Sequence, residues 1–162
     1  MFPEWAPQEQ LWIGFPGDHE EWPKALAIAQ RQAAAFATTA AAHGNSVKLF
    51  TRDAADMITA RALIADAVQV QREPFGDIWL RDTTPLSIHD DHRSPALVDF
   101  DFNGWGGKYL MPGDEDIGAR LAATTGLPCR HVPLIFEGGA VDTDGTGLFV
   151  TTEQCLLNPN RN

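Results

Sequence analysis

The longest amphipathic pattern in the chain lies in its first third. Over residues 22–42 apolar residues recur every three or four positions, which predicts a helix with Pro23 in its first turn and Gly44 at its end. Residues 47–50 predict a buried strand, residues 53–66 a second helix capped by Asp53, and residues 68–71 another strand. From residue 47 onwards the predicted order is therefore strand, helix, strand.

Short strands dominate the rest of the chain. They are predicted over residues 78–80, 86–88 and 96–100, with a polar turn at residues 90–94. A helix with acids in its first turn is expected over residues 114–126, followed by a strand over residues 129–134. Asp144 and Gly145 join strands predicted over residues 140–143 and 147–152 as a hairpin. This alternation predicts an α/β or α+β architecture, and no linker marks a second domain.

Composition narrows the classes of function. The 162 residues, 44% of them hydrophobic, suffice for one globular domain, and the net charge is −10. Such a charge argues against nucleic acid or an anionic membrane as partner and favours a small cationic ligand. Neither a signal peptide nor a membrane span is expected. The two cysteines, Cys129 and Cys155, lack CxxC spacing, which favours a reducing, cytoplasmic location without structural zinc.

One candidate for cation binding follows the predicted strand at residues 78–80. The carboxylate of Asp82 could hold a cation there, and the indole of Trp79 offers a flat face for a cation–π contact. The plainer interpretation is a surface ion pair between Arg81 and Asp82, with Trp79 in the core.

Two glycine-rich segments add further candidates. Three glycines surround Trp105 in residues 102–108, which suits either a ligand-binding wall or simply a tight loop. Glu137 precedes two glycines and follows an apolar run, so we expect it to be partly buried. A buried Glu is either paired with a basic group or accepts hydrogen bonds within its own turn.

Two other clusters are not assigned chemistry. His89 and His92 flank two aspartates in the polar turn, where solvated side chains are more usual than metal ligands, so no metal is assigned. Cys155 has no neighbouring histidine or cation in the sequence, which favours a buried structural thiol over a nucleophile.

Taken in order, the motifs of the chain resemble the agmatine deiminase family. Bacterial-type peptidylarginine deiminases are near relatives of that family, and the agmatine branch looks closer. The resemblance rests on residues 3–5, 22–23, 79–83, 102–107, 137–139 and 151–162.

The resemblance implies a fold and a chemistry. The fold would be the N-terminal part of a five-bladed α/β propeller, the pentein fold. The reaction would hydrolyse a guanidinium group to a urea plus ammonia, agmatine giving N-carbamoylputrescine in polyamine biosynthesis, through a covalent Cys intermediate and without a cofactor. Asp82 would bind the guanidinium, Trp79 and Trp105 would line the site, and Glu137 would hydrogen-bond the catalytic His.

The chain also departs from the family. The His-x-Asp motif and the nucleophilic Cys lie downstream of the Asn-Pro-Asn-Arg-Asn segment in the family, and His131 and Cys155 do not sit in those motifs. Thr84 stands where the family usually has Gly, which could tighten the turn after Asp82.

We therefore expect an N-terminal half, residues 1–162 of an incomplete deiminase domain, that is inactive alone. The missing half would be supplied in cis or by another chain, and a homo-oligomer is possible. The alternatives are a non-catalytic guanidinium-binding or assembly module, and a peptidylarginine deiminase.

Overall fold

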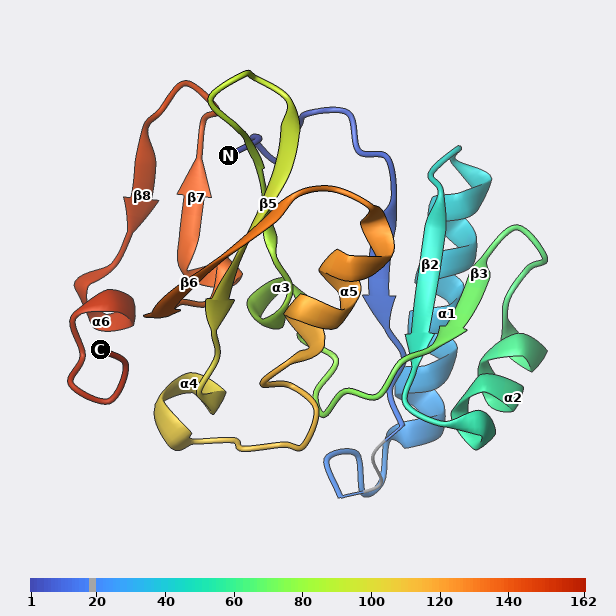
Figure 1. The fold of residues 1–162 in the computed structure, drawn as a ribbon. Helices are drawn as coiled ribbons and strands as arrows, with labels where there is room; N and C mark the ends of the chain where they lie inside the picture. The colour runs from blue at the N-terminus through green and yellow to red at the C-terminus, as the bar shows by residue number, and fades with distance from the viewer. Residues whose placement is uncertain (18–19) are drawn as a thin grey trace. The chain divides into compact units, whose positions relative to one another are not determined.

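The computed structural model describes residues 1–17 and 20–162, and the chain divides into two compact units. One unit is Pro7–Leu80, and the other combines Met1–Ala6 with Arg81–Asn162. Figure 1 shows the elements of both, and each unit is described here by itself.

The first unit is a parallel three-stranded sheet with two helices. Its strands are β1 (Leu11–Gly14), β2 (Val47–Thr51) and β3 (Gln69–Arg72), in that order across the sheet. Helices α1 (Leu26–Ala42) and α2 (Ala54–Leu63) provide the crossovers that parallel neighbours require. The buried core of this unit consists of Phe15, Ala37, Val47, Leu49, Ala60 and Val68.

The strand, helix, strand order expected from residue 47 onwards is confirmed. The side chain of Asp53 accepts a hydrogen bond from the backbone N–H of Asp56 and so caps α2. Helix α1 begins four residues later than predicted, at Leu26, because the chain around Trp22 and Pro23 forms a turn. Strand β1 was not predicted, since four residues between polar and proline-rich flanks carry no distinct period.

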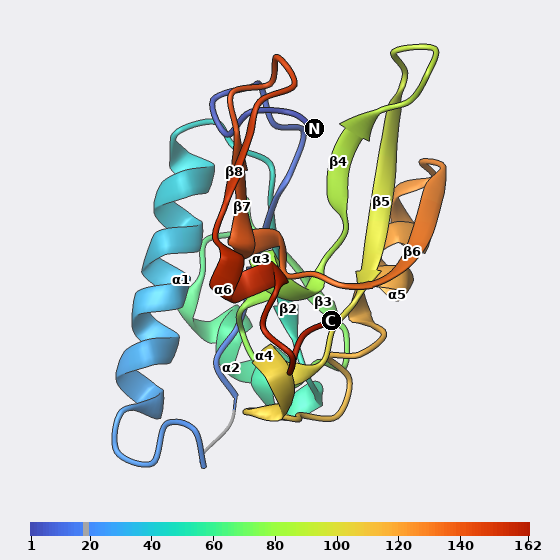
Figure 2. The same ribbon diagram turned by 90° about the vertical axis from the view of Figure 1, so that its left-hand side faces the viewer.

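The second unit contains two sheets. Strands β4 (Leu86–His89) and β5 (Pro95–Asp101) pair antiparallel, and β5 pairs parallel with β6 (Cys129–Ile135). Strands β7 (Val141–Thr143) and β8 (Phe149–Thr151) form a separate antiparallel hairpin, as Figure 2 shows. The predicted strands at residues 86–88, 96–100 and 129–134 and the hairpin are thereby confirmed, with ends displaced by up to two residues.

Four shorter helices and one longer one complete this part of the chain. Helix α5 (Ile117–Thr125) falls within the helix predicted over residues 114–126 and buries Ile117 and Leu121. The short ones are α3 (Leu80–Thr83), which starts at the boundary of the units, α4 (Gly104–Gly107), the 3-10 turn η1 (Gly138–Ala140) and α6 (Glu153–Leu156).

Two local predictions are wrong. Residues 78–80 form no strand, because the carboxylate of Asp77 accepts from the backbone N–H of Ile78 and the N–H of Leu80 donates to the Ile78 carbonyl, turning the chain into α3. The acids expected in the first turn of α5 precede it instead. Glu115 accepts a hydrogen bond from the backbone N–H of Gly113 in the preceding loop.

Within the described residues, no helix is long and apolar enough to cross a membrane. The 17 residues of α1 fall short of the roughly 20 apolar residues that a span requires.

Replacing the capping carboxylate by Asp53→Ala should destabilise the first unit by about 1 kcal/mol, because the N–H of Asp56 loses its acceptor. Urea denaturation followed by circular dichroism measures the change. The control is Asp66→Ala, which removes an exposed carboxylate outside α2. Equal stability of the two variants would contradict the capping role.

Candidate active site

Asp82, on α3, is held by two N–H donors from distant parts of the sequence. Its Oδ2 accepts a hydrogen bond from the indole Nε1 of Trp105 at 3.0 Å, and its Oδ1 accepts one from the backbone N–H of Gly139 at 2.8 Å. A Cβ atom at position 139 would lie 2.3 Å from Oδ1, so only glycine permits this approach. The surface pair between Arg81 and Asp82 is not formed, because Arg81 pairs with Glu4.

Glu137 lies immediately before η1 and is 3% exposed. Its Oε1 forms an ion pair with Nε of Arg161 at 3.1 Å. Of the two roles left open by the sequence, the structure therefore shows pairing with a basic group. Burial raises the pKa of Glu137, the positive charge of Arg161 opposes that rise, and the negative charge of Asp82 adds to it. The two carboxylates lie on neighbouring segments, because Glu137 stands two residues before Gly139, whose backbone N–H donates to Asp82.

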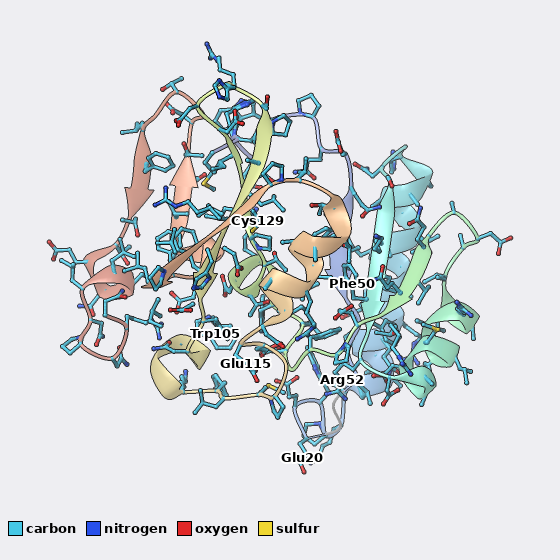
Figure 3. All side chains as sticks on the ribbon, viewed as in Figure 1. Glu20, Phe50, Arg52, Trp105, Glu115 and Cys129 are labelled. Atoms are coloured by element: carbon cyan, nitrogen blue, oxygen red, sulfur yellow. The ribbon has the colours of Figure 1, made fainter. Side chains whose placement is uncertain are left out.

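The turn that carries Trp105 is left-handed throughout. Residues Gly104, Trp105, Gly106 and Gly107 have φ values of 66°, 55°, 81° and 78°. Such values are unusual for a tryptophan, and strained residues of this kind tend to occur at functional sites. The side chain of Asn103 accepts from the N–H of Gly106, and the Phe102 ring packs edge-on against the indole, 4.9 Å between centroids. Of the two alternatives considered for this segment, the tight loop is formed, and the indole N–H of Trp105, which is labelled in Figure 3, donates to Asp82.

The segment 158–162 closes against this turn. The side-chain N–H of Asn103 donates to the carbonyl of Asn160, and a Cβ at Gly106 would lie 2.4 Å from Nδ2 of Asn160 and 2.8 Å from a terminal nitrogen of Arg161. Sequence reasoning gave Arg161 no role. An arginine in a polar, proline-containing segment looks solvated, and only the three-dimensional contact with Glu137 distinguishes it.

Trp79 belongs to the other unit and its side chain is 59% exposed. The core position considered for it is therefore wrong, because a core indole would be enclosed. Its place in the wall of the site stays a prediction.

In the described part of the chain, neither His131 nor Cys155 forms a hydrogen bond or ion pair with Asp82 or Glu137. On β6, His131 lies between Asp99, 3.6 Å from its Nδ1, and Asp101, 3.3 Å from its Nε2. Burial raises the pKa of Asp99 although His131 lowers it.

Cys155 on α6 is only half-buried, so the prediction of a buried thiol there is wrong. Among the described residues no cluster of His, Cys, Asp and Glu is arranged to hold a metal.

A separate pocket of about 320 Å³ is lined by parts of the loop at residues 102–115. Neither Asp82 nor Glu137 lines it, so it is distinct from the paired carboxylates.

Comparison with known proteins shows the family to which the chain belongs. A family model described as Porphyromonas-type peptidyl-arginine deiminase matches residues 1–162, the whole chain. The chain belongs to this family. A Marinomonas protein named "Putative agmatine deiminase" is 35% identical over 98% of the chain, and a Yersinia pestis protein with the same name is also 35% identical.

Solved structures of the deiminase family agree with the fold. A substrate-bound agmatine deiminase from C. jejuni superposes with a TM-score of 0.87 at 26% identity, over 99% of this chain and 47% of its own. A Porphyromonas gingivalis protein named "Putative Arginine Deiminase" superposes with a TM-score of 0.84 at 31% identity, over 99% of this chain and 49% of its own. The expected pentein fold is confirmed, of which the chain forms a part. The chain spans 44% of the length of the Marinomonas relative.

The left-handed turn at residues 104–107, which carries Trp105, offers a matched pair of substitutions. Gly107→Ala adds a Cβ where no atom lies within 4 Å, so it should cost only the strain of a left-handed alanine, about 1 kcal/mol. Gly106→Ala should cost about 1 kcal/mol more, because its Cβ displaces Asn160 and Arg161. Chemical denaturation followed by tryptophan fluorescence compares them, and equal costs would show that segment 158–162 does not pack on the turn.

Proposed function

We propose that this chain supplies the guanidinium-binding carboxylate, Asp82, and the carboxylate that orients the catalytic His, Glu137, of a guanidine-hydrolysing deiminase whose substrate is agmatine. The observation that carries the proposal is the fixed pair of carboxylates. Asp82 is oriented by the N–H groups of Trp105 and Gly139, beside the buried carboxylate of Glu137. Relatives named agmatine deiminase support the choice of substrate.

A guanidinium group suits such an acceptor. It is planar and carries five N–H donors, which carboxylates bind through two parallel hydrogen bonds. Each oxygen of Asp82 accepts one hydrogen bond within the protein, and a carboxylate oxygen has lone pairs for about two. Acceptor capacity therefore remains for a ligand. The net charge of −10 raises the local concentration of a small cation around the chain.

The two indoles have different roles in this proposal. Trp105 holds Asp82 through its N–H and forms a rigid wall. Trp79, three residues before Asp82 and largely exposed, supplies a face for a cation–π contact with the substrate.

The chemistry of the whole enzyme is covalent. A Cys thiolate attacks the guanidinium carbon, a His protonates the ammonia that leaves, and the same His then activates the water that releases the urea product. Agmatine plus water thus gives N-carbamoylputrescine plus ammonia, a step towards putrescine, in the cytoplasm and with no cofactor. Asp82 holds the cation and Glu137 fixes the tautomer of the His.

A non-catalytic guanidinium-binding module is the second candidate, because the carboxylates of this chain can bind a cation without any nucleophile. A peptidylarginine substrate is the third, favoured by the family description. Calorimetric titration with agmatine and with a peptide that ends in arginine separates the two substrates.

Asp82→Asn should weaken agmatine binding at least about thirtyfold, equivalent to about 2 kcal/mol, because it removes the charge that faces the guanidinium but keeps the side-chain shape. Isothermal titration calorimetry measures the affinity. Asp91→Asn, an exposed position between β4 and β5, is the control and should bind as the unmodified chain does. Unchanged affinity of the Asp82 variant would remove the basis of the proposed function.

The chain of residues 1–162 should release no ammonia from agmatine. Its two thiols are poor candidates for a nucleophile. Partial desolvation raises the pKa of the Cys129 thiol, and the negative charge of Asp99 raises it further. Cys155 forms no described contact with Asp82 or Glu137. A coupled ammonia assay tests this. Turnover that is lost in Cys155→Ser and kept in Cys129→Ser would show that Cys155 is a nucleophile.

A further inference from the structure

Arg161 is a buried cation. Its side chain is 14% exposed and that of its ion-pair partner Glu137 is 4% exposed. In the described residues, Nε and one terminal nitrogen of Arg161 are buried without a hydrogen bond, and so is Oε1 of Glu137. The two groups therefore interact mainly through their charges, across 3.1 Å and in an environment with little water.

The backbone around Arg161 is fixed by three asparagines. The N–H of Arg161 donates to the carbonyl of Asn158, and the side chain of Asn162 both accepts from the N–H of Ile135 and donates to its carbonyl. Asn160 is tied to Asn103 in the glycine turn. These anchors fix the backbone of the segment, and the ion pair with Glu137 then holds the guanidinium itself.

We propose that Arg161 is the positioning residue of the site, which holds Glu137 as an oriented carboxylate and locks the glycine turn that carries Trp105. The pairing itself stands on the geometry of this chain. Its consequence for catalysis rests on the proposed function, in which Glu137 acts on the catalytic His.

The charges around Glu137 explain why a positioning cation is needed. The groups that act on it are Arg161, which is attractive, and Asp82, which is repulsive. Burial and Asp82 both favour the protonated acid, which cannot accept two hydrogen bonds from a partner as a carboxylate does. Arg161 counteracts both and favours the charged form.

The test is the titration of Glu137 in the 162-residue chain, followed by NMR of glutamate labelled with ¹³C at the carboxyl carbon. The resonance is assigned by its loss in Glu137→Gln. In Arg161→Gln the titration midpoint should rise by about one pH unit or more, because an opposite charge at this distance lowers a carboxyl pKa by that amount. Arg161→Lys should restore part of the shift. Arg130→Gln, an exposed arginine on β6, should leave the midpoint unchanged.

An unchanged midpoint in a folded Arg161→Gln chain would overturn the proposal. If that variant does not fold, the double variant Arg161→Gln with Glu137→Gln decides, because neutralising both members of a buried pair avoids an isolated charge. Recovery of a folded chain in the double variant supports the proposal, and failure to recover contradicts it. No ligand or turnover enters this measurement, so it is independent of whether agmatine is the substrate.

Discussion

Two negative charges close together, one of them buried, set the conditions for the rest of this site. A carboxylate removed from water without a partner is strongly unfavourable, and a second carboxylate nearby makes it more so. The structure answers with three groups: the indole N–H of Trp105 and the backbone N–H of Gly139 on Asp82, and the guanidinium of Arg161 on Glu137. Each comes from a different segment, so the second unit must be folded before any of them is in place.

Two glycines allow these segments to approach one another closely. Gly139 lets the η1 turn approach Asp82 to hydrogen-bond distance, and Gly106 leaves room for the end of the segment at residues 158–162. Because Gly106 also has a φ of 81°, a larger residue there would both strain the turn and displace Arg161. Glycine is therefore needed at positions 106 and 139 because the backbone there approaches other groups closely, and these two residues are not generic loop residues.

Whether a feature could be predicted from the sequence depends on how far apart in the sequence its interacting residues lie. The cap at Asp53 and the hairpin after Thr143 depend on residues a few positions apart, and both were predicted correctly. Residues 78–80 read as a strand because their apolar character gives no sign of the turn at Asp77. Asp82, Trp105 and Glu137 were singled out by residue type and resemblance.

The contacts among those residues were not predictable in the same way. Arg161 lies 24 positions from Glu137 in the sequence, and no local pattern distinguishes a buried arginine from a solvated one. The indole N–H of Trp105 likewise reaches a carboxylate 23 positions away. Such pairs are set by the packing of β5, β6 and the short helices, which composition and periodicity do not encode residue by residue.

Charge balance links this arrangement to the direction of the proposed reaction. In formal charges, the two carboxylates and the one guanidinium give the site a net charge of −1. A guanidinium substrate neutralises it and gains hydrogen bonds to Asp82, whereas the urea formed by hydrolysis is neutral and leaves the charge uncompensated again. Under the proposed function the site would therefore bind the substrate more tightly than the product. Arg161 does not change this charge count, because a buried Glu137 near Asp82 favours the protonated form when its cation is removed, and the net charge then stays at −1. What Arg161 adds is an oriented carboxylate, which under the proposed function positions the catalytic His.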